Sequence, residues 1–234
     1  MELLTSFYYP NNISREKELI LTLENNLNNT LINKIHLYIT EIDYNRFIIS
    51  DFKDNINYYK IVFIVKNYQP KYKELFTFSS TFDNKIICIC NSDIEFDIAN
   101  SEIFNKVDNN IFFLTRHECD NSKPLIDNYG GSHDAFIFNS NILKNKIENK
   151  DLSYIDYIQN TPGIESLLTI FFTENLNYNI LNPCYEIKLI HNHTSTYRTY
   201  NGSKPIGHTW PHRLGGIYAN TIWCKYMYYP CRLL

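Results

Sequence analysis

Glycine is scarce in this chain, and the chain has neither a long apolar run nor a strong excess of one charge. Seven of its 234 residues are glycine. Its apolar runs fall far short of the roughly 20 residues that span a bilayer, and the N-terminal MELLTSFYYP has no basic region before a long apolar stretch. We therefore expect neither a transmembrane segment nor a signal peptide. The formal charge of −3 at pH 7 gives no general attraction to nucleic acid or to an anionic membrane, and we expect no nucleic-acid partner.

The six cysteines lack the spacing of zinc ligands. They are Cys88, Cys90, Cys119, Cys184, Cys224 and Cys231. Cys88 and Cys90 are two residues apart in one apolar run, so they are expected to face the core from the same side of a strand. The simplest interpretation is a reduced chain in the cytoplasm.

Apolar patterning predicts alternating strands and helices. The predicted strands are residues 2–8, 34–40, 60–66, 86–90, 110–116, 134–138, 179–182 and 186–190, and the predicted helices are residues 13–29, 71–82, 98–107, 141–150 and 164–175. Ser14 is the expected N-cap of the first helix. Strand 60–66 is apolar throughout, which predicts burial on both faces. The alternation favours a single α/β domain with a mostly parallel central sheet flanked by helices.

The segment KIICICNSDIEFD, residues 85–97, is the centre of the pattern. Its apolar run predicts a fully buried strand that stops at Asn91-Ser92-Asp93. Ligands of open α/β sheets bind at the carboxyl ends of strands, and a carboxylate there can hold Mg²⁺ or Mn²⁺ together with phosphate oxygens. The alternative is that the same three residues cap a following helix, because Asn, Ser and Asp lead the N-cap preferences.

Three further clusters carry candidate functional residues. Asp134 follows a Gly-Gly-Ser-His loop. Glu165 lies in the first turn of a helix that Pro162-Gly163 opens, where the helix dipole alone also favours a carboxylate. His191 and His193 follow a strand, and side chains two residues apart can face one cleft if the backbone stays extended. Neutral imidazole is a good metal ligand, although a purely structural histidine is the alternative.

The order and spacing of these clusters resemble the nucleotide-sugar glycosyltransferases of the GT-A fold, particularly the small single-domain enzymes of large DNA viruses of algae and amoebae. The resemblance covers about residues 2–200. It rests on the first strand, Arg15 and Glu18, Asn91-Ser92-Asp93-Ile94, Thr115-Arg116, Ser132-His133-Asp134-Ala135-Phe136, Pro162-Gly163-Ile164-Glu165 and His191-x-His193-x-Ser195-x-x-Arg198-x-Tyr200. It implies a GT-A-like domain over 1–200, with a nucleotide-sugar half (1–116) and an acceptor half (117–200). Residues 201–234 would form an aromatic tail packed on the same domain. The protein would lie in the cytoplasm, which is the host cytoplasm if the protein is viral.

The resemblance implies a metal site and a donor site. Asp93 corresponds to the second acidic residue of the Asp-x-Asp signature that binds Mn²⁺ or Mg²⁺ on a nucleoside-diphosphate sugar, and the expected donor is a UDP-sugar. The first position is Asn91, a departure that removes one charge; its amide could still bond to the ribose or to a metal-bound water. His193, or else His191, would complete the metal shell. The implied donor-binding residues are Thr5, Phe7, Tyr8, Arg15, Asn91, Ser92, Arg116, Ser195 and Arg198. Phe7 or Tyr8 could stack on uracil, with core packing as the alternative.

The implied reaction transfers a sugar to a glycan or glycoprotein acceptor. In an inverting enzyme a carboxylate takes the acceptor proton, and Glu165 is the first candidate. Asp134 is the second, or it binds donor-sugar hydroxyls instead; a retaining enzyme would need no such base. Trp210 and Trp223 would form an acceptor platform, a self-association surface or a packed edge.

Two other functions stay open. One is a non-catalytic sugar- or nucleotide-binding protein of the same fold, which Asn91 would favour. The other is a hydrolase whose metal site uses His191, His193, His208 and His212, although no His-Glu-x-x-His spacing is present.

Overall fold

The computed structural model describes residues 1–98, 100–108, 110–118, 133–159, 161 and 164–196. The strands are β1 (Glu2–Phe7), β2 (Lys34–Ile39), β3 (Ile61–Val65), β4 (Ile86–Cys90), β5 (Ile94–Ile98), β6 (Asn110–Glu118), β7 (His133–Asn139), β8 (Asn179–Leu181) and β9 (Ile187–His191). The helices are α1 (Ile13–Asn28), α2 (Glu41–Phe47), α3 (Tyr72–Ser79), α4 (Ser140–Ile147) and α5 (Ile164–Ile170), the last continued by a π-helical turn, Phe171–Asn175.

The strands form one curled sheet in the order β3-β2-β1-β4-β7-β6-β9-β5, with β8 beside β6. Pairing is parallel from β3 through β2 and β1 to β4, and again where β6 meets β8 and β9. β7 is antiparallel to both of its neighbours, and β5 is antiparallel to β9. The predicted α/β class and the mostly parallel sheet are confirmed.

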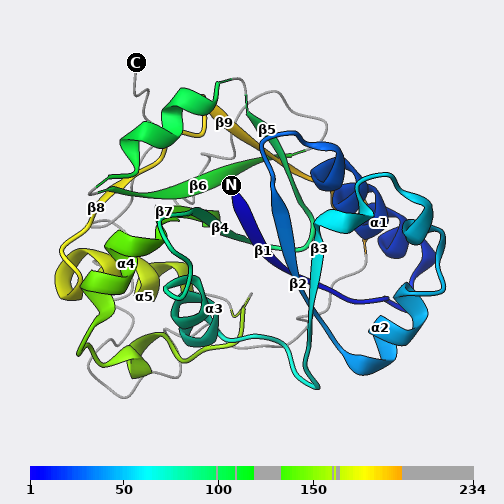
Figure 1. Cartoon of the computed structure of the whole chain (residues 1–234), viewed down its shortest axis with the longest axis horizontal. Helices are drawn as coiled ribbons and strands as arrows, with labels where there is room; N and C mark the ends of the chain where they lie inside the picture. Colours follow the sequence, from blue (N-terminus) through cyan, green and yellow to red (C-terminus); the bar gives the residue numbers. More distant parts are fainter. Residues whose placement is uncertain (99, 109, 119–132, 160, 162–163, 197–234) are drawn as a thin grey trace.

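Helices cover both faces of the sheet (Figure 1). One apolar layer joins the sheet to α1 and α2, through residues such as Leu19, Leu23 and Phe47. The other joins it to α3, α4 and α5, through residues such as Phe76 and Leu143. β4 lies between β1 and β7, and three of its side chains are completely buried, as predicted. Because β4 is buried on both faces, polar side chains can follow only where the strand ends. The candidate residues Asn91, Ser92 and Asp93 lie at that end.

Three local predictions were wrong. β3 is half-exposed, with Val62 38% and Val65 42% accessible, because it is the edge strand and pairs only with β2 among the described strands. The N-cap of α1 is Asn12, whose side chain accepts from the backbone N–H of Arg15, and not Ser14. Residues 98–107 do not form an α-helix: β5 ends there and a 3₁₀ turn, Ser101–Lys106, follows.

Two asparagine side chains, one in α1 and one at its C-cap, bond to the backbone at the free edge of β5. The Asn26 amide donates to the Ile94 carbonyl at 2.8 Å and accepts from the Phe96 N–H at 3.2 Å. Asn29 donates to the Phe96 carbonyl at 2.9 Å. Buried backbone groups need such partners, so these bonds replace a missing strand and fix α1 beside the turn that precedes β5.

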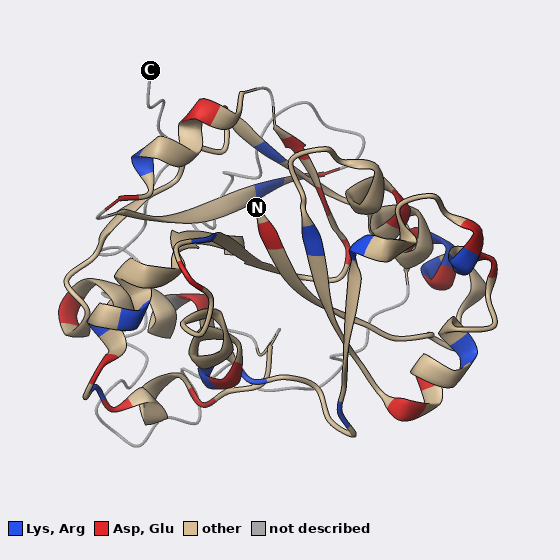
Figure 2. Cartoon of the chain, in the orientation of Figure 1, with Lys and Arg blue, Asp and Glu red and all other residues tan. Residues whose placement is uncertain are grey.

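Acidic and basic side chains are interspersed over the described helices (Figure 2). None of the helices in the described part of the chain has the length and apolarity needed to cross a membrane.

Candidate metal centre

Asp93 lies in the tight turn between β4 and β5. The Ile94 N–H donates to the Asn91 carbonyl at 3.3 Å, and the Asn192 N–H donates to the Asp93 carbonyl at 2.9 Å. A strand follows the turn, so the alternative in which Asn91-Ser92-Asp93 caps a helix was wrong. Asp93, which is 9% exposed, is therefore held between the end of β4 and the segment that follows β9.

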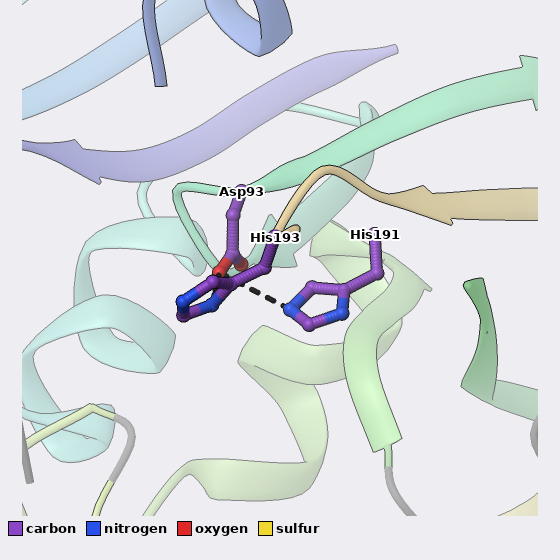
Figure 3. A group of neighbouring side chains, drawn as sticks. All are labelled: Asp93, His191 and His193. Atoms are coloured by element: carbon purple, nitrogen blue, oxygen red, sulfur yellow. Dashed lines mark ion pairs between the residues drawn. The ribbon is translucent and has the colours of Figure 1, made fainter. Parts of the chain in front are cut away.

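The structure brings together the three residues that the sequence suggested as metal ligands (Figure 3). One potential ligand atom from each of Asp93, His191 and His193 lies within 4.8 Å of the others. Nε2 of His191 is 3.3 Å from Oδ2 of Asp93, and Nδ1 of His193 is 3.5 Å from the same oxygen. His191 is the last residue of β9, and a tight turn follows it, in which the His193 N–H donates to the His191 carbonyl at 3.0 Å. Both imidazoles face the Asp93 carboxylate from the two ends of this turn.

Arg15 also contacts the Asp93 carboxylate, with Nη2 2.5 Å from Oδ2. Burial by itself raises the pKa of Asp93, but the bonds to both histidines and the charge of Arg15 outweigh it, and the pKa lies well below its ordinary value. Burial lowers the pKa of His191, whereas Asp93 raises it, and the net change is upward. The centre is thus built to keep Asp93 ionised inside the protein.

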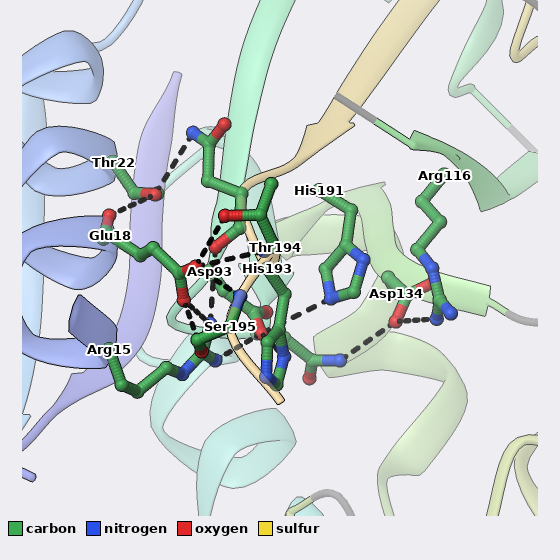
Figure 4. A network of polar contacts seen from close by, with 12 residues as sticks. Arg15, Glu18, Thr22, Asp93, Arg116, Asp134, His191, His193, Thr194 and Ser195 are labelled. Carbon is green, nitrogen blue, oxygen red and sulfur yellow. Dashed lines mark hydrogen bonds and ion pairs between the residues drawn. The ribbon is translucent and has the colours of Figure 1, made fainter. Parts of the chain in front are cut away.

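The pair Arg15–Glu18 anchors the chain beyond His193 (Figure 4). Glu18 accepts the backbone N–H groups of Thr194 and Ser195 at 2.8 and 2.7 Å, and both of their hydroxyls at 2.9 and 3.0 Å. Partial burial raises the pKa of Glu18, but hydrogen bonds from Arg15 and from these residues lower it to about 2. Because this pKa is below that of the unfolded chain, Glu18 stabilises the fold above about pH 4.5 and loses this contribution as the pH falls toward 2.

A second ion-pair chain leaves the centre on the other side. Nδ1 of His191 lies 2.9 Å from Oε2 of Glu118, and Nε of Arg116 donates to Oε1 of Glu118 at 2.8 Å. Nη1 of Arg116 lies 3.2 Å from Oδ2 of Asp134. Burial alone would lower the pKa of Arg116, but the charges of both carboxylates raise it. Glu118 was not among the residues suggested by the sequence, although it lies two positions beyond Arg116 on the same face of β6.

Asn91 points toward Asp134 and donates to its Oδ1 at 3.0 Å. This contact explains why an amide suits position 91: a second carboxylate there would face Asp134 with like charge. The Asn91 amide is thereby committed to Asp134 in this structure.

Asn91→Asp is expected to destabilise the fold by about 1 kcal/mol at neutral pH, or ~2–4 °C in melting temperature. Arg116 offsets only part of the repulsion because it already pairs with Asp134 and Glu118. Repulsion raises the folded-state pKa of one carboxylate above the unfolded value of about 3.9, so the penalty applies above that value and fades as the pH falls below it. Melting curves recorded at neutral pH and at a pH below about 3.9 check this prediction. Asn45→Asp, on the exposed side of α2, is the control. Equal loss in both variants, or no pH dependence, would contradict it.

The remaining candidate donor residues are placed as follows. Phe7 is 3% exposed and packs in the core against Phe47 and Phe52, which is the packing alternative, so its ring is not available for stacking on a base. Tyr8, the residue after β1, is half-buried. Thr5 is buried in β1, and Ser92 is half-buried in the turn.

Glu165 is half-buried in the first turn of α5. The segment that leads to this helix is tied to the site, because Nε2 of Gln159 donates to the carbonyl of Cys90 at 2.7 Å. Pro162, Gly163, Arg198, Tyr200, His208, Trp210, His212 and Trp223 lie outside the described residues.

Comparison with known proteins gives structural likeness without sequence likeness. No family model matches the chain, and no curated protein matches it. A mannosyltransferase from Pyrobaculum calidifontis, PcManGT, solved with GDP-Man and Mn²⁺, aligns with a TM-score of 0.50 at 10% identity over 82% of this chain. The match extends over 56% of the mannosyltransferase. The fold is that of GT-A-like nucleotide-sugar enzymes.

Two further similar structures align with lower scores. S. aureus TarS with UDP-GlcNAc has a TM-score of 0.39 at 10% identity, over 62% of this chain and 46% of TarS. A Bacillus anthracis protein described as a glucose-1-phosphate thymidylyltransferase has a TM-score of 0.47 at 11% identity, over 77% of this chain and 85% of that protein. The neighbours thus include glycosyl and nucleotidyl transferases. The comparisons give no support to the viral part of the resemblance.

Proposed function

We propose that this protein is a metal-dependent glycosyltransferase that moves a sugar from a nucleoside-diphosphate donor, a UDP-sugar, to a glycan or glycoprotein acceptor. The observation that carries the proposal is the meeting of Asp93, His191 and His193 after the central strand, within reach of Arg15. This position corresponds to the ligand-binding edge of open α/β sheets.

The donor set and the local charge fit a divalent cation. Carboxylate is a ligand that Mg²⁺ and Mn²⁺ prefer, and imidazole binds transition metals, so a site with both kinds of ligand can hold Mn²⁺. The three facing atoms have lone pairs that repel one another unless a proton or a cation lies between them. Two guanidinium groups are linked to four carboxylates, which leaves a formal charge of −2 when both histidines are neutral. These four carboxylates are Glu18, Asp93, Glu118 and Asp134. A bound Mn²⁺ or Mg²⁺ would supply positive charge for the departing diphosphate.

The side chains around the centre would bind the donor. Arg15 lies beside Asp93 and would face the diphosphate. Tyr8 would face the base, and Arg198 would pair with diphosphate oxygens as a fork. We assign residues 1–116 to donor binding and 117–200 to acceptor binding. Asp134, held by Asn91 and Arg116, would accept hydrogen bonds from donor-sugar hydroxyls.

Inverting transfer needs a base for the acceptor hydroxyl. The acceptor oxygen attacks the anomeric carbon, its proton passes to a carboxylate, and the nucleoside diphosphate leaves. We assign the proton acceptor to Glu165, because the start of α5 is tied to the end of β4 through Gln159. Asp134 is the second candidate.

The position of the glycines favours glycosyl over nucleotidyl transfer. Backbone cradles for phosphate groups use glycine so that the main chain can approach closely. The first glycine in this chain is Gly130, so the β1–α1 connection, with Pro10, cannot form a glycine-rich cradle. Side chains and a cation would then have to bind the phosphates, as in the proposed site.

Thermal melting with UDP, with and without Mn²⁺, tests the proposal. A ligand at about 100 times its dissociation constant stabilises the folded state by roughly 2.7 kcal/mol. We expect a shift that needs UDP and Mn²⁺ together, and a smaller one with GDP and Mn²⁺. Stabilisation by Zn²⁺ alone without a response to UDP would favour the histidine-based hydrolase. UDP binding without any turnover of UDP-sugars would favour the non-catalytic alternative.

A further inference from the structure

Glu118 holds the imidazole of His191 from the side opposite Asp93. The two residues are direct partners in the parallel register of β6 and β9. Nδ1 of His191 lies 2.9 Å from Oε2 of Glu118, while Nε2 of the same ring lies 3.3 Å from Oδ2 of Asp93. The ring is therefore fixed at both nitrogens, with the Glu118 carboxylate on its Nδ1 side and the candidate metal position on its Nε2 side.

The Glu118 carboxylate is itself held in place. Its other oxygen, Oε1, accepts from Nε of Arg116 at 2.8 Å, and Arg116 continues to Asp134. Each oxygen of Glu118 thus has its own donor. A carboxylate that accepts the Nδ1–H of a histidine fixes the tautomer in which Nε2 has a free lone pair, and it makes that nitrogen a better ligand.

We propose that Glu118 is a positioning residue that holds His191 with its Nε2 toward the metal position at Asp93. The inference deepens the proposed function and rests on its metal site. It assigns His191 as a ligand through Nε2, whereas His193 faces Asp93 through Nδ1. Arg116 supports this arrangement without contacting His191, because it pairs with the Glu118 carboxylate and with Asp134 at the same time.

The protein contains a second carboxylate–histidine contact that can serve as an internal control. Oε2 of Glu2 lies 3.0 Å from Nε2 of His36, and both of these residues are buried, whereas the Glu118 side chain is 31% exposed. The remaining nitrogen of His36, Nδ1, has no hydrogen-bond partner among the described residues. His36 is also not part of the one group of potential metal ligands found among those residues. Glu2 has the same chemistry without a ligand position beyond the ring.

Glu118→Gln is the decisive substitution because the flanking donors fix the amide orientation. Nε of Arg116 donates, so the amide oxygen has to face Arg116, and the amide nitrogen then faces Nδ1 of His191. An amide N–H donating to Nδ1 selects the tautomer with a proton on Nε2. That tautomer cannot bind a metal ion through Nε2.

The test measures Mn²⁺ binding in the presence of UDP by calorimetry, for the wild type, Glu118→Gln and Glu2→Gln. We expect about a 10- to 100-fold weaker Mn²⁺ affinity for Glu118→Gln and wild-type affinity for Glu2→Gln. Long-range ¹⁵N NMR of the metal-free protein, at a pH where the ring is neutral, is expected to show His191 protonated at Nδ1 in the wild type and at Nε2 in Glu118→Gln.

The outcomes separate this inference from the proposed function. Mn²⁺ bound equally by the wild type and Glu118→Gln would overturn the role of Glu118 and leave the metal site in place. An absence of Mn²⁺ binding in the wild type, with or without UDP, would overturn both. The wild-type tautomer needs no variant, so an Nε2–H ring there would contradict the inference even if Glu118→Gln did not fold.

Discussion

Asp93→Ala is expected to abolish the Mn²⁺-dependent binding of UDP. Asp93 is the one residue of the centre that contacts both histidines and Arg15 through a single carboxylate oxygen. Loss of a residue that only orients a metal ligand weakens binding by about 10- to 100-fold, so loss of a direct ligand should cost at least about 100-fold. Calorimetric titration of UDP with and without Mn²⁺ measures the effect.

The substitution also removes the main partner of a buried arginine, so stability has to be measured beside binding. Breaking a buried ion pair can cost about 3–5 kcal/mol. The cost should be smaller here because Arg15 keeps Glu18 and the Asn192 carbonyl, at 3.0 and 3.1 Å. A melting curve of Asp93→Ala, recorded beside the UDP titration, separates the effect on folding from the effect on binding.

Asp97→Asn is the matched control, because Asp97 is exposed on the same β5 segment. It should leave both UDP binding and melting temperature unchanged. If folded Asp93→Ala still bound UDP with wild-type dependence on Mn²⁺, the metal position would have to lie elsewhere.

Local sequence patterns carried the prediction of the central strand and the first helix. The run at residues 86–90 is β-branched and apolar, and both of its faces are buried in the structure. The apolar positions of α1 recur at helical spacing, and Leu19, Leu23 and Leu27 form its buried stripe. Periodicity reports such burial directly, because it depends only on which side of an element faces the core.

Burial of β3 could not be inferred in the same way. Apolar strands occur both in the centre and at the edge of sheets, and the order of strands is set by tertiary pairing. β5 is a different case, because Ile94, Phe96 and Ile98 alternate with Glu95 and Asp97. The period-two signal was present, but the preceding Asn-Ser-Asp also matches a helix cap, and that local similarity concealed the strand.

The candidate site divides along the same line. Asp93, His191 and His193 are residue types that commonly bind metals, and each follows a strand, so the sequence could suggest them as a group. The contact between Glu118 and His191 arises from the parallel register of β6 and β9, which lie about seventy residues apart in the chain. The commitment of Asn91 to Asp134 likewise depends on the antiparallel pairing of β4 with β7. Neither register can be read from one sequence.

Glu165→Gln is expected to reduce kcat by about 10²- to 10⁴-fold while leaving donor binding nearly unchanged. The amide keeps the size and polarity of the carboxylate but cannot take the acceptor proton. Glu165 belongs to the first turn of α5, and Gln159 ties the segment before this helix to Cys90, the residue before Asn91. Initial rates over a range of UDP-sugar concentrations separate kcat from KM.

Glu174→Gln is the control for this substitution, since Glu174 is exposed at the far end of the same helical segment. It should turn over as the wild type does. Asp134→Asn distinguishes the second candidate base: if Asp134 binds donor-sugar hydroxyls, KM for the UDP-sugar should rise, whereas a loss confined to kcat would transfer the role of base to Asp134. The anomeric configuration of the product, followed by NMR, decides between an inverting and a retaining mechanism. Full activity of Glu165→Gln with a retained configuration would mean that no carboxylate base is needed, because a retaining transferase does not require one.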